Sequence, residues 1–252
     1  MRYLIQQFIN NHTRKDSPVT ELNHYHQVVG APVPEWQGAR PLSRAALVGR
    51  YCRLEPLDAQ SHSQQLFEAY QLAPDERDWT WLASSRPDTP QAAWHWVQGK
   101  AADPTLVPYA VVEQKRGEAV GLVCFMRIDT SNGTVEIGHV TWSPRMKNSV
   151  LGTEAVWLLL SAAFEQGYRR VEWKCDSLNT ASHNAALRLG FTFEGRLRQM
   201  MVRKGRNRDS EWFSIIDGEW PQRNAALSRW LAPENFDAQG RQKEPLSAFH
   251  AR

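Results

Sequence analysis

Three strand-like segments follow one another between residues 107 and 142 with only short turns between them. VPYAVVEQ (107–114) and AVGLVCFMRI (119–128) flank the glycine-containing turn KRGE, and TVEIGHVTW (134–142) follows across SNG. Connections this short join antiparallel strands, whereas a parallel pair needs a crossover of a dozen or more residues. The chain is therefore predicted to build its sheet around an antiparallel meander, which excludes a doubly wound parallel sheet.

Helix- and strand-like segments alternate on both sides of this meander. Period-2 alternation marks the strands, and longer runs of helix-forming residues between turn signals mark the helices. On these grounds we predict strands at 49–58, 168–176, 197–205 and 210–217, and helices at 59–73, 90–101, 153–166 and 179–189. This order predicts an α/β chain of the α+β kind, in which helices flank a mixed antiparallel and parallel sheet.

The two ends of the chain lack this periodicity. Residues 1–45 contain four prolines, so we expect an N-terminal arm that is extended or partly disordered. We expect the folded domain to span residues 46–220 and residues 221–252 to form a C-terminal tail.

Charge, hydropathy and cysteine content exclude several classes of protein. The 30 basic residues are mixed with 27 acidic ones, so the net charge is only +3 and a nucleic acid is not an expected partner. The longest apolar run, 155–164, is far shorter than the ~20 residues that cross a bilayer, so we expect a cytoplasmic protein without a membrane partner. Three widely spaced cysteines without a C-x-x-C pair favour free thiols over disulfides or zinc, so we expect no metal. Both a monomer and a homodimer are compatible with this composition.

A polar turn, RMKNSVLGTEA (145–155), leads into the most apolar helix of the sequence. The first amides of a helix have no partner within the helix, and together with the helix dipole they can bind an anion such as phosphate. The turn is therefore a candidate phosphate site, and the alternative is an ordinary polar helix start.

Four stretches in this order resemble the GNAT family of acyl-CoA-dependent N-acetyltransferases. They are VEIGHVTWSP, the turn K-x-x-V-x-G-T-E-A, VEWKCDSLNTASHNAALRLGF and EGRLRQ, and they look most like the ribosomal-protein N-terminal (alanine/serine) acetyltransferase branch. The resemblance implies a GNAT fold whose central sheet opens at a splayed cofactor cleft. It implies acetyl-CoA as co-substrate and direct transfer of its acetyl group to a primary amine, here a protein or peptide N-terminal α-amine. Two alternatives remain: a polyamine or drug acetyltransferase, and a catalytically impaired CoA-binding regulatory module.

The same resemblance implies which residues contact the cofactor. In the pyrophosphate turn, Lys147 stands where the family has glutamine or arginine, Val150 replaces the first glycine, and only Gly152 is retained. The donors are backbone amides, which any residue except proline supplies, so binding does not require the missing glycine. The predicted cofactor contacts are Val140, Trp142, Lys147, Asn148, Gly152, Thr153 and Asn179.

Acetyl transfer needs a neutral amine, so a base must take a proton at pH 7. Glu136 is our candidate base, because strict alternation along 134–142 places it on one face with Gly138, Val140 and Trp142. The alternative is that Glu136 only pairs with an arginine across the sheet. His139, on the opposite face, is the weaker rival for this role, and we expect it instead to be a core or edge histidine satisfied by backbone.

The departing thiolate needs a proton as well. Many relatives supply a tyrosine from the helix before the LGF motif, but Ala186 stands there in this sequence. We therefore predict Ser182 as the proton donor. The alternative for Ser182 and Asn179 is helix capping.

Two further features are open to more than one interpretation. The basic run RKGRNRD (203–209) is interpreted as a solvated hairpin turn, the alternative being a grip on phosphate or on an acidic segment. The tryptophan pairs at 79 and 81 and at 94 and 96 either wall a substrate groove or belong to the core.

Overall fold

The computed structural model describes residues 21–250, which divide into two compact units between Gln37 and Gly38. In the first unit, β1 (Glu21–Leu22) and β2 (Val28–Val29) form an antiparallel hairpin. Residues 1–20 of the predicted arm and 251–252 of the predicted tail lie outside the described residues. The limits given above for arm, domain and tail stay predictions, although residue 39 already pairs within the second unit: the Ala39 amide donates to the carbonyl of Thr130 at 2.8 Å.

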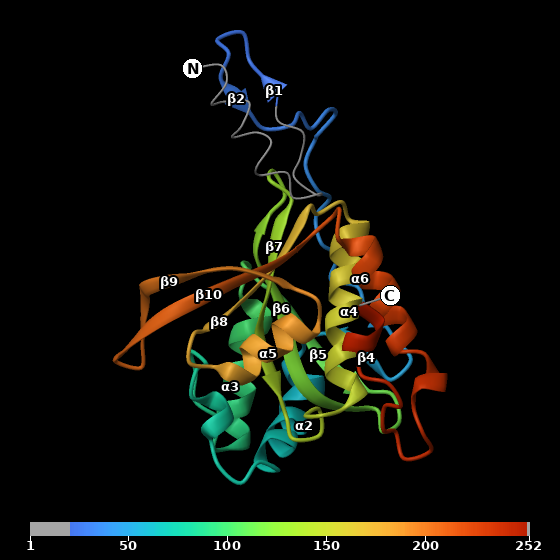
Figure 1. The fold of residues 1–252 in the computed structure, drawn as a ribbon. Helices are drawn as coiled ribbons and strands as arrows, with labels where there is room; N and C mark the ends of the chain where they lie inside the picture. Colours follow the sequence, from blue (N-terminus) through green and yellow to red (C-terminus); the bar gives the residue numbers. More distant parts are fainter. Residues whose placement is uncertain (1–20, 251–252) are drawn as a thin grey trace. The chain divides into compact units, whose positions relative to one another are not determined.

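An eight-stranded mixed sheet forms the centre of the second unit (Figure 1). Its strands are β3 (Leu47–Val48), β4 (Cys52–Pro56), β5 (Val107–Glu113), β6 (Glu118–Asp129), β7 (Thr134–Trp142), β8 (Arg170–Asp176), β9 (Thr192–Arg203) and β10 (Arg206–Ile216). Their order is β3-β4-β5-β6-β7-β8-β10-β9, and only the β7–β8 pair is parallel. The predicted mixed sheet and its β5–β6–β7 meander are therefore confirmed.

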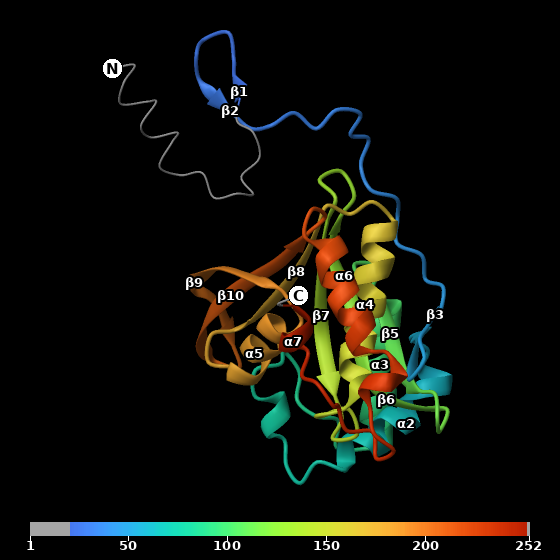
Figure 2. The same cartoon turned by 45° about the vertical axis from the view of Figure 1, so that its right-hand side comes forward.

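Helices cover both faces of this sheet (Figure 2). α2 (Ala59–Gln71) and α3 (Pro90–Ala102) pack on one face of β6, where Leu122 and Cys124 are fully buried. α4 (Val150–Glu165) and α6 (Trp220–Trp230) pack together on the other face, and α5 (Thr180–Arg188) contacts β8 and β9. The shorter helices are η1 (Arg77–Trp79), η2 (Pro233–Asn235) and α7 (Ser247–His250). Within residues 21–250, no helix has the length and hydropathy needed to cross a membrane.

A buried carboxylate fixes α4 against the edge of the sheet. Glu154 is only 2% exposed, and its carboxylate accepts from the amides of Arg50, Tyr51 and Cys52 at 2.7–2.8 Å. Arg50 and Tyr51 lie in the turn that joins β3 to β4, and Cys52 is the first residue of β4, so this segment is held by a helix residue 102 to 104 positions later in the chain. An ionised acceptor with three donors offsets much of the cost of burying the charge.

The segment after residue 220 contains structure that the sequence analysis did not predict. Trp220 stacks on Phe164 with ring centroids 5.0 Å apart, and the Trp157 indole donates to Asn224 at 2.8 Å. These contacts hold α6 on α4, which explains why α4 is apolar on nearly all sides: it is covered by the sheet and by a second helix.

The parallel pair β7–β8 is short. Ladder pairing joins only residues 134–137 to residues 170–173, yet β7 continues to Trp142 and β8 to Asp176. Beyond Ile137 and Trp173 the two strands diverge, so the sheet is open at the carboxyl ends of its two central parallel strands. The expected splay is therefore present, and open ends of this kind are where α/β sheets bind ligands.

Candidate active site

A β-bulge shapes β7 where it leaves β8. Gly138 pairs with Cys124 and Thr141 with Leu122, so two residues, His139 and Val140, face one residue of β6. His139 takes a φ of 52°, which is rare outside glycine. Bulges of this kind redirect the strand and are frequent beside active sites.

The bulge overturns the predicted alternation along β7. Glu136, Gly138 and Thr141 pair with Met126, Cys124 and Leu122, which face α2 and α3. Trp142 instead lies on the face of α4, where its ring packs over Gly121 and Gly152. The prediction that Glu136 and Trp142 share a face was therefore wrong, because the extra residue shifts the period by one.

Glu136 is a buried carboxylate held between two cations. It is 6% exposed, and Oε2 lies 3.1 Å from Nε of Arg127 and 3.0 Å from Nζ of Lys174. Burial raises the pKa of the Glu136 carboxyl, and the charge of Lys174 opposes that rise. The arginine pairing that we considered as an alternative is present, and the raised pKa brings the carboxyl closer to the range of a general base.

Lys174 completes this cluster from β8. Its ammonium also lies 2.7 Å from Glu172 and 4.0 Å from the centre of the Trp212 ring. Sequence reasoning missed Lys174, although its alternation with Trp173 and Cys175 assigns it to the face that Glu172 shares with Glu136 across the parallel pair.

His139 is neutral and bonded to a side chain. Its Nδ1 lies 3.0 Å from Nζ of Lys100, and burial, with the charge of Lys100, lowers the pKa of the imidazole to about 4. The expected backbone partner is thus replaced by a lysine. At pH 7 the ring accepts a hydrogen bond from Lys100 and carries no charge.

The first turn of α4 leaves backbone donors open. The Ser149 hydroxyl caps the Leu151 amide at 3.3 Å, but within residues 21–250 the amides of Val150 and Gly152 donate to no other group. Asn148 precedes them with a φ of 53°. A Cβ on Gly152 would lie 3.3 Å from Nε1 of Trp142, so this glycine lets the tryptophan pack against the helix start. Open amides at the N-terminus of a 16-residue helix fit a pyrophosphate group.

The other residues predicted for the pyrophosphate turn differ in where they point. The exposed Lys147 forms an ion pair at 2.5 Å with Asp78, a residue of η1. Thr153 is fully buried, and its hydroxyl accepts from Arg188 at 2.7 Å. Lys147 is thus exposed just before this helix start, whereas the Thr153 side chain faces the interior.

Asn179 and Ser182 form a cap at the start of α5, as the alternative interpretation held. The Asn179 side chain accepts from the Ser182 amide at 3.1 Å. The Ser182 hydroxyl accepts from the Trp173 indole at 3.0 Å and also interacts with the thiol of Cys175. Burial raises the pKa of that thiol to about 11, so Cys175 is not a nucleophile at neutral pH.

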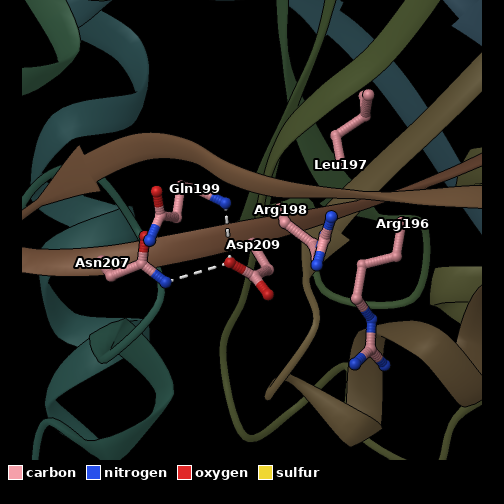
Figure 3. A pocket seen from close by; sticks show the side chains of 6 residues that line it. All are labelled: Arg196, Leu197, Arg198, Gln199, Asn207 and Asp209. Carbon is pink, nitrogen blue, oxygen red and sulfur yellow. Dashed lines mark hydrogen bonds between the residues drawn. The ribbon is translucent and has the colours of Figure 1, made fainter.

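A separate hollow lies on the β9–β10 hairpin (Figure 3). Asp209 accepts there from the Gln199 amide at 2.8 Å and from the Asn207 side chain at 2.9 Å. The hollow is lined by Arg196, Leu197, Arg198, Gln199, Asn207 and Asp209. These residues belong to a bulged hairpin and not to the opening between β7 and β8, so we do not place the active site here. Within residues 21–250, no group of three histidine, cysteine or acidic residues could hold a metal ion.

Comparison with known sequences gives two curated relatives, of which the chain spans 63% and 48%. It is 30% identical over 113 residues, 44% of its own length, to the uncharacterized N-acetyltransferase p20 of Bacillus licheniformis. It is 33% identical over 85 residues, 34% of its own length, to a ribosomal-protein-serine acetyltransferase of Escherichia coli (strain K12).

Comparison with solved structures covers more of the chain. A GCN5-related N-acetyltransferase from Brucella melitensis superposes with a TM-score of 0.85 at 41% identity, over 87% of this chain and 100% of that one. A GNAT-family protein of Chromobacterium violaceum superposes with a TM-score of 0.72 at 38% identity, over 82% and 100% of the two chains. The sequence profile of the acetyltransferase (GNAT) domain matches residues 52–192, more than half of the chain. The opened sheet, the bulged central strand and the uncapped helix start thus belong to a member of the GNAT acetyltransferase family, a family of acyltransferases.

Proposed function

We propose that the chain transfers an acetyl group from acetyl-CoA to a primary amine, and that the acceptor is the N-terminal α-amine of a protein or peptide. The observation that carries the proposal is the opening between β7 and β8, which has free helix amides near one face and a buried carboxylate on the other. The match to a ribosomal-protein-serine acetyltransferase supports the choice of acceptor. A cytoplasmic location is part of the same proposal.

Acetyl-CoA supplies the thioester, and the chain supplies binding and proton transfer. In the proposal the amides of Val150 and Gly152 and the Lys147 ammonium bind the pyrophosphate, with Asn148 in the turn before them. The Trp142 ring packs against Gly152 in the first turn of α4. Asn179 lines the path of the pantetheine arm at the start of α5. Val140, in the bulge, offers backbone to the acetyl carbonyl.

The proposed bond changes assign a role to two side chains. The amine nitrogen attacks the carbonyl carbon, the carbon–sulfur bond breaks, and the nitrogen gives up one proton. An α-amine has a pKa of roughly 8, so the Glu136 carboxylate assists by accepting that proton, directly or through water. Ser182 donates toward the departing sulfur, and solvent restores its proton.

Titration calorimetry with acetyl-CoA, followed by a thiol-release assay over a panel of amines, tests the proposal. We expect acetyl-CoA to bind and thiol release to be faster with peptides that have a free N-terminus than with the same peptides blocked, or with polyamines. Binding without release on any amine would reduce the chain to a CoA-binding module. Release on polyamines alone would assign the small-molecule alternative.

A Gly152→Glu variant tests the phosphate site. The added carboxylate would repel the pyrophosphate at the helix start and crowd Trp142, so we expect acetyl-CoA binding to weaken at least about fivefold. Gly218→Glu is the matched control, because a side chain at Gly218 meets nothing within 4 Å. Equal affinity in both variants would place the phosphate site elsewhere.

A further inference from the structure

Arg208 is a half-buried arginine without a partner. Its Nε is buried and donates to no acceptor within residues 21–250, and no carboxylate of that part of the chain lies within ion-pair distance of its guanidinium. Burial lowers the pKa of Arg208, and the charge of Asp176 only partly opposes this. An arginine whose desolvation is only partly compensated is costly for the fold, so an anionic group that binds it there would recover some of the cost.

The register places Arg208 beside the opening in the sheet. β10 pairs with β8 as far as Ser210 and Asp176, and Arg208 stands two residues beyond. The extra residues of the register shift at this point belong to β9, so β10 keeps its alternation and Arg208 lies on the face that Ser210 shares with Trp212. Trp212 lies under Lys174, the partner of Glu136, so Arg208 and Glu136 face the same side of the sheet. In agreement with this placement, the negative charge of Glu136 raises the pKa of Arg208.

A second unpartnered polar group lies next to Arg208. Ser210 is 2% exposed, and its hydroxyl has no hydrogen-bond partner among the described residues. The nearest acid on β8, Asp176, accepts from the Leu178 amide at 3.0 Å. The Arg208 Nε and the Ser210 hydroxyl, two residues apart on β10, therefore have no acceptor among residues 21–250.

The charges near Arg208 are mixed, because the acids Asp176 and Glu136 act on it as well as Arg203, and Asp103 acts on His139. The positive charge of Arg203 lowers the pKa of both His139 and Arg208, and the Lys100 ammonium lies 3.0 Å from Nδ1 of His139. Glu136 is already paired with two cations. A cationic group of the acceptor would be repelled by the Arg208 guanidinium itself, whereas an anionic group would be attracted to it.

We propose that Arg208, with Ser210, binds a carboxylate of the acceptor, so that the preferred substrate is an amine with a carboxylate a few bonds away. The proposal rests on the proposed acetyl transfer and names the acceptor class. Two sources share this chemistry: the α-carboxylate of a free amino acid, and an aspartate or glutamate side chain near the N-terminus of a peptide. Arginine suits both, because its planar guanidinium can bind a carboxylate through two parallel hydrogen bonds.

Matched acceptors that differ only in the anion test the proposal. The peptide amides Ser-Asp-Ala-Ala and Ser-Asn-Ala-Ala form one pair, and serine and serinamide form the other. In each pair kcat/KM is measured for the native chain and for Arg208→Gln, Arg208→Lys and Arg206→Gln. Arg206 is the control, because it is an exposed arginine on the same strand.

We expect Arg208→Gln to lose roughly 10- to 100-fold in kcat/KM on the anionic member of the preferred pair and to change little on the neutral member. Arg208→Lys should recover part of the loss, and Arg206→Gln should match the native chain. Acetyl-CoA affinity should stay unchanged and the midpoint of thermal unfolding should not fall, because Arg208 has no partner to lose. The pair that shows the effect identifies the source of the carboxylate.

Equal losses on both members of each pair, or a lower unfolding midpoint, would make Arg208 a structural residue and overturn the proposal. If no amine is acetylated, the proposed transfer fails but the binding claim can still be judged. Calorimetry with N-acetyl-Ser-Asp-Ala-Ala amide and its asparagine counterpart requires no turnover. Preference for the aspartate peptide that disappears in Arg208→Gln would sustain the site, and no preference would reject it.

Discussion

Glu136→Gln is expected to turn over at least ~100-fold more slowly than the native chain, with an optimum at higher pH. Glutamine keeps the size of the side chain but cannot accept a proton at neutral pH. Only amines that solvent has already deprotonated would then react. A pH–rate profile of kcat/KM measures both effects. In the native chain, activity should rise with pH through the raised pKa of Glu136, and this limb should be lost in the variant.

Glu172→Gln is the matched control for that experiment. Glu172 also contacts Lys174 and lies on the same face of the sheet, but it is paired within β8 to Arg170 at 3.0 Å. If both variants lose the same activity, the ion-pair cluster matters and the base does not. An unchanged pH profile in Glu136→Gln would assign the residue to structure.

The difference in stability between the native chain and Glu136→Gln should depend on pH in a defined direction. The pKa of Glu136 is raised in the fold, so burial favours the protonated form and ionisation costs stability. Relative to the glutamine variant, the native chain should therefore lose stability as pH rises from the ordinary pKa of glutamate, about 4.3, through the raised value. Unfolding by urea at several pH values measures this difference separately from activity.

Glu154→Ala is expected to cost about 3–5 kcal/mol of unfolding free energy, the largest effect on stability that we predict. The change leaves the amides of Arg50, Tyr51 and Cys52 without their acceptor and opens a cavity beside α4. Urea denaturation followed by circular dichroism gives the value. If the alanine variant fails to fold, Glu154→Gln, which keeps one acceptor oxygen, should fold with an intermediate loss.

Glu165→Ala is the control on the same helix, because Glu165 lies exposed in the last turn of α4. We expect it to change the unfolding free energy by less than about 0.5 kcal/mol. A similar loss in both variants would mean that helix propensity, and not the three amides, determines the result.

The sequence was sufficient for the elements whose pattern repeats and insufficient where a single residue changes the pattern. The meander and α4 were predicted because alternation and apolar length are visible over many residues. Trp142 was placed on the wrong face because of one bulged residue that the sequence alternation does not reveal. This residue moves every later side chain of the strand to the opposite face of the sheet. β9 was predicted too short because it is an edge strand with almost every side chain exposed, so it shows no buried period.

The candidate site was only partly visible for the same reason. Glu136 and the turn before α4 could be chosen from the resemblance and from elementary chemistry, and their roles stay predictions. The side-chain partners could not be chosen, since Lys174, Arg127 and Arg188 come from strands and helices whose packing no local pattern specifies. Arg208 was read as part of a solvated turn, because a basic run in sequence does not show which of its arginines is buried.

The seam between β7 and β8, only four residue pairs long, has a consequence for how the domain coheres. Past it, two half-sheets continue side by side with backbone donors and acceptors that do not meet each other. A molecule rich in amide groups that binds between them would form hydrogen bonds to both, as a strand would. Its removal would leave the backbone groups of both half-sheets to bond with water. Ligand binding in the opening and association of the two half-sheets would then be thermodynamically coupled. The domain would therefore be most rigid when its acyl donor is bound.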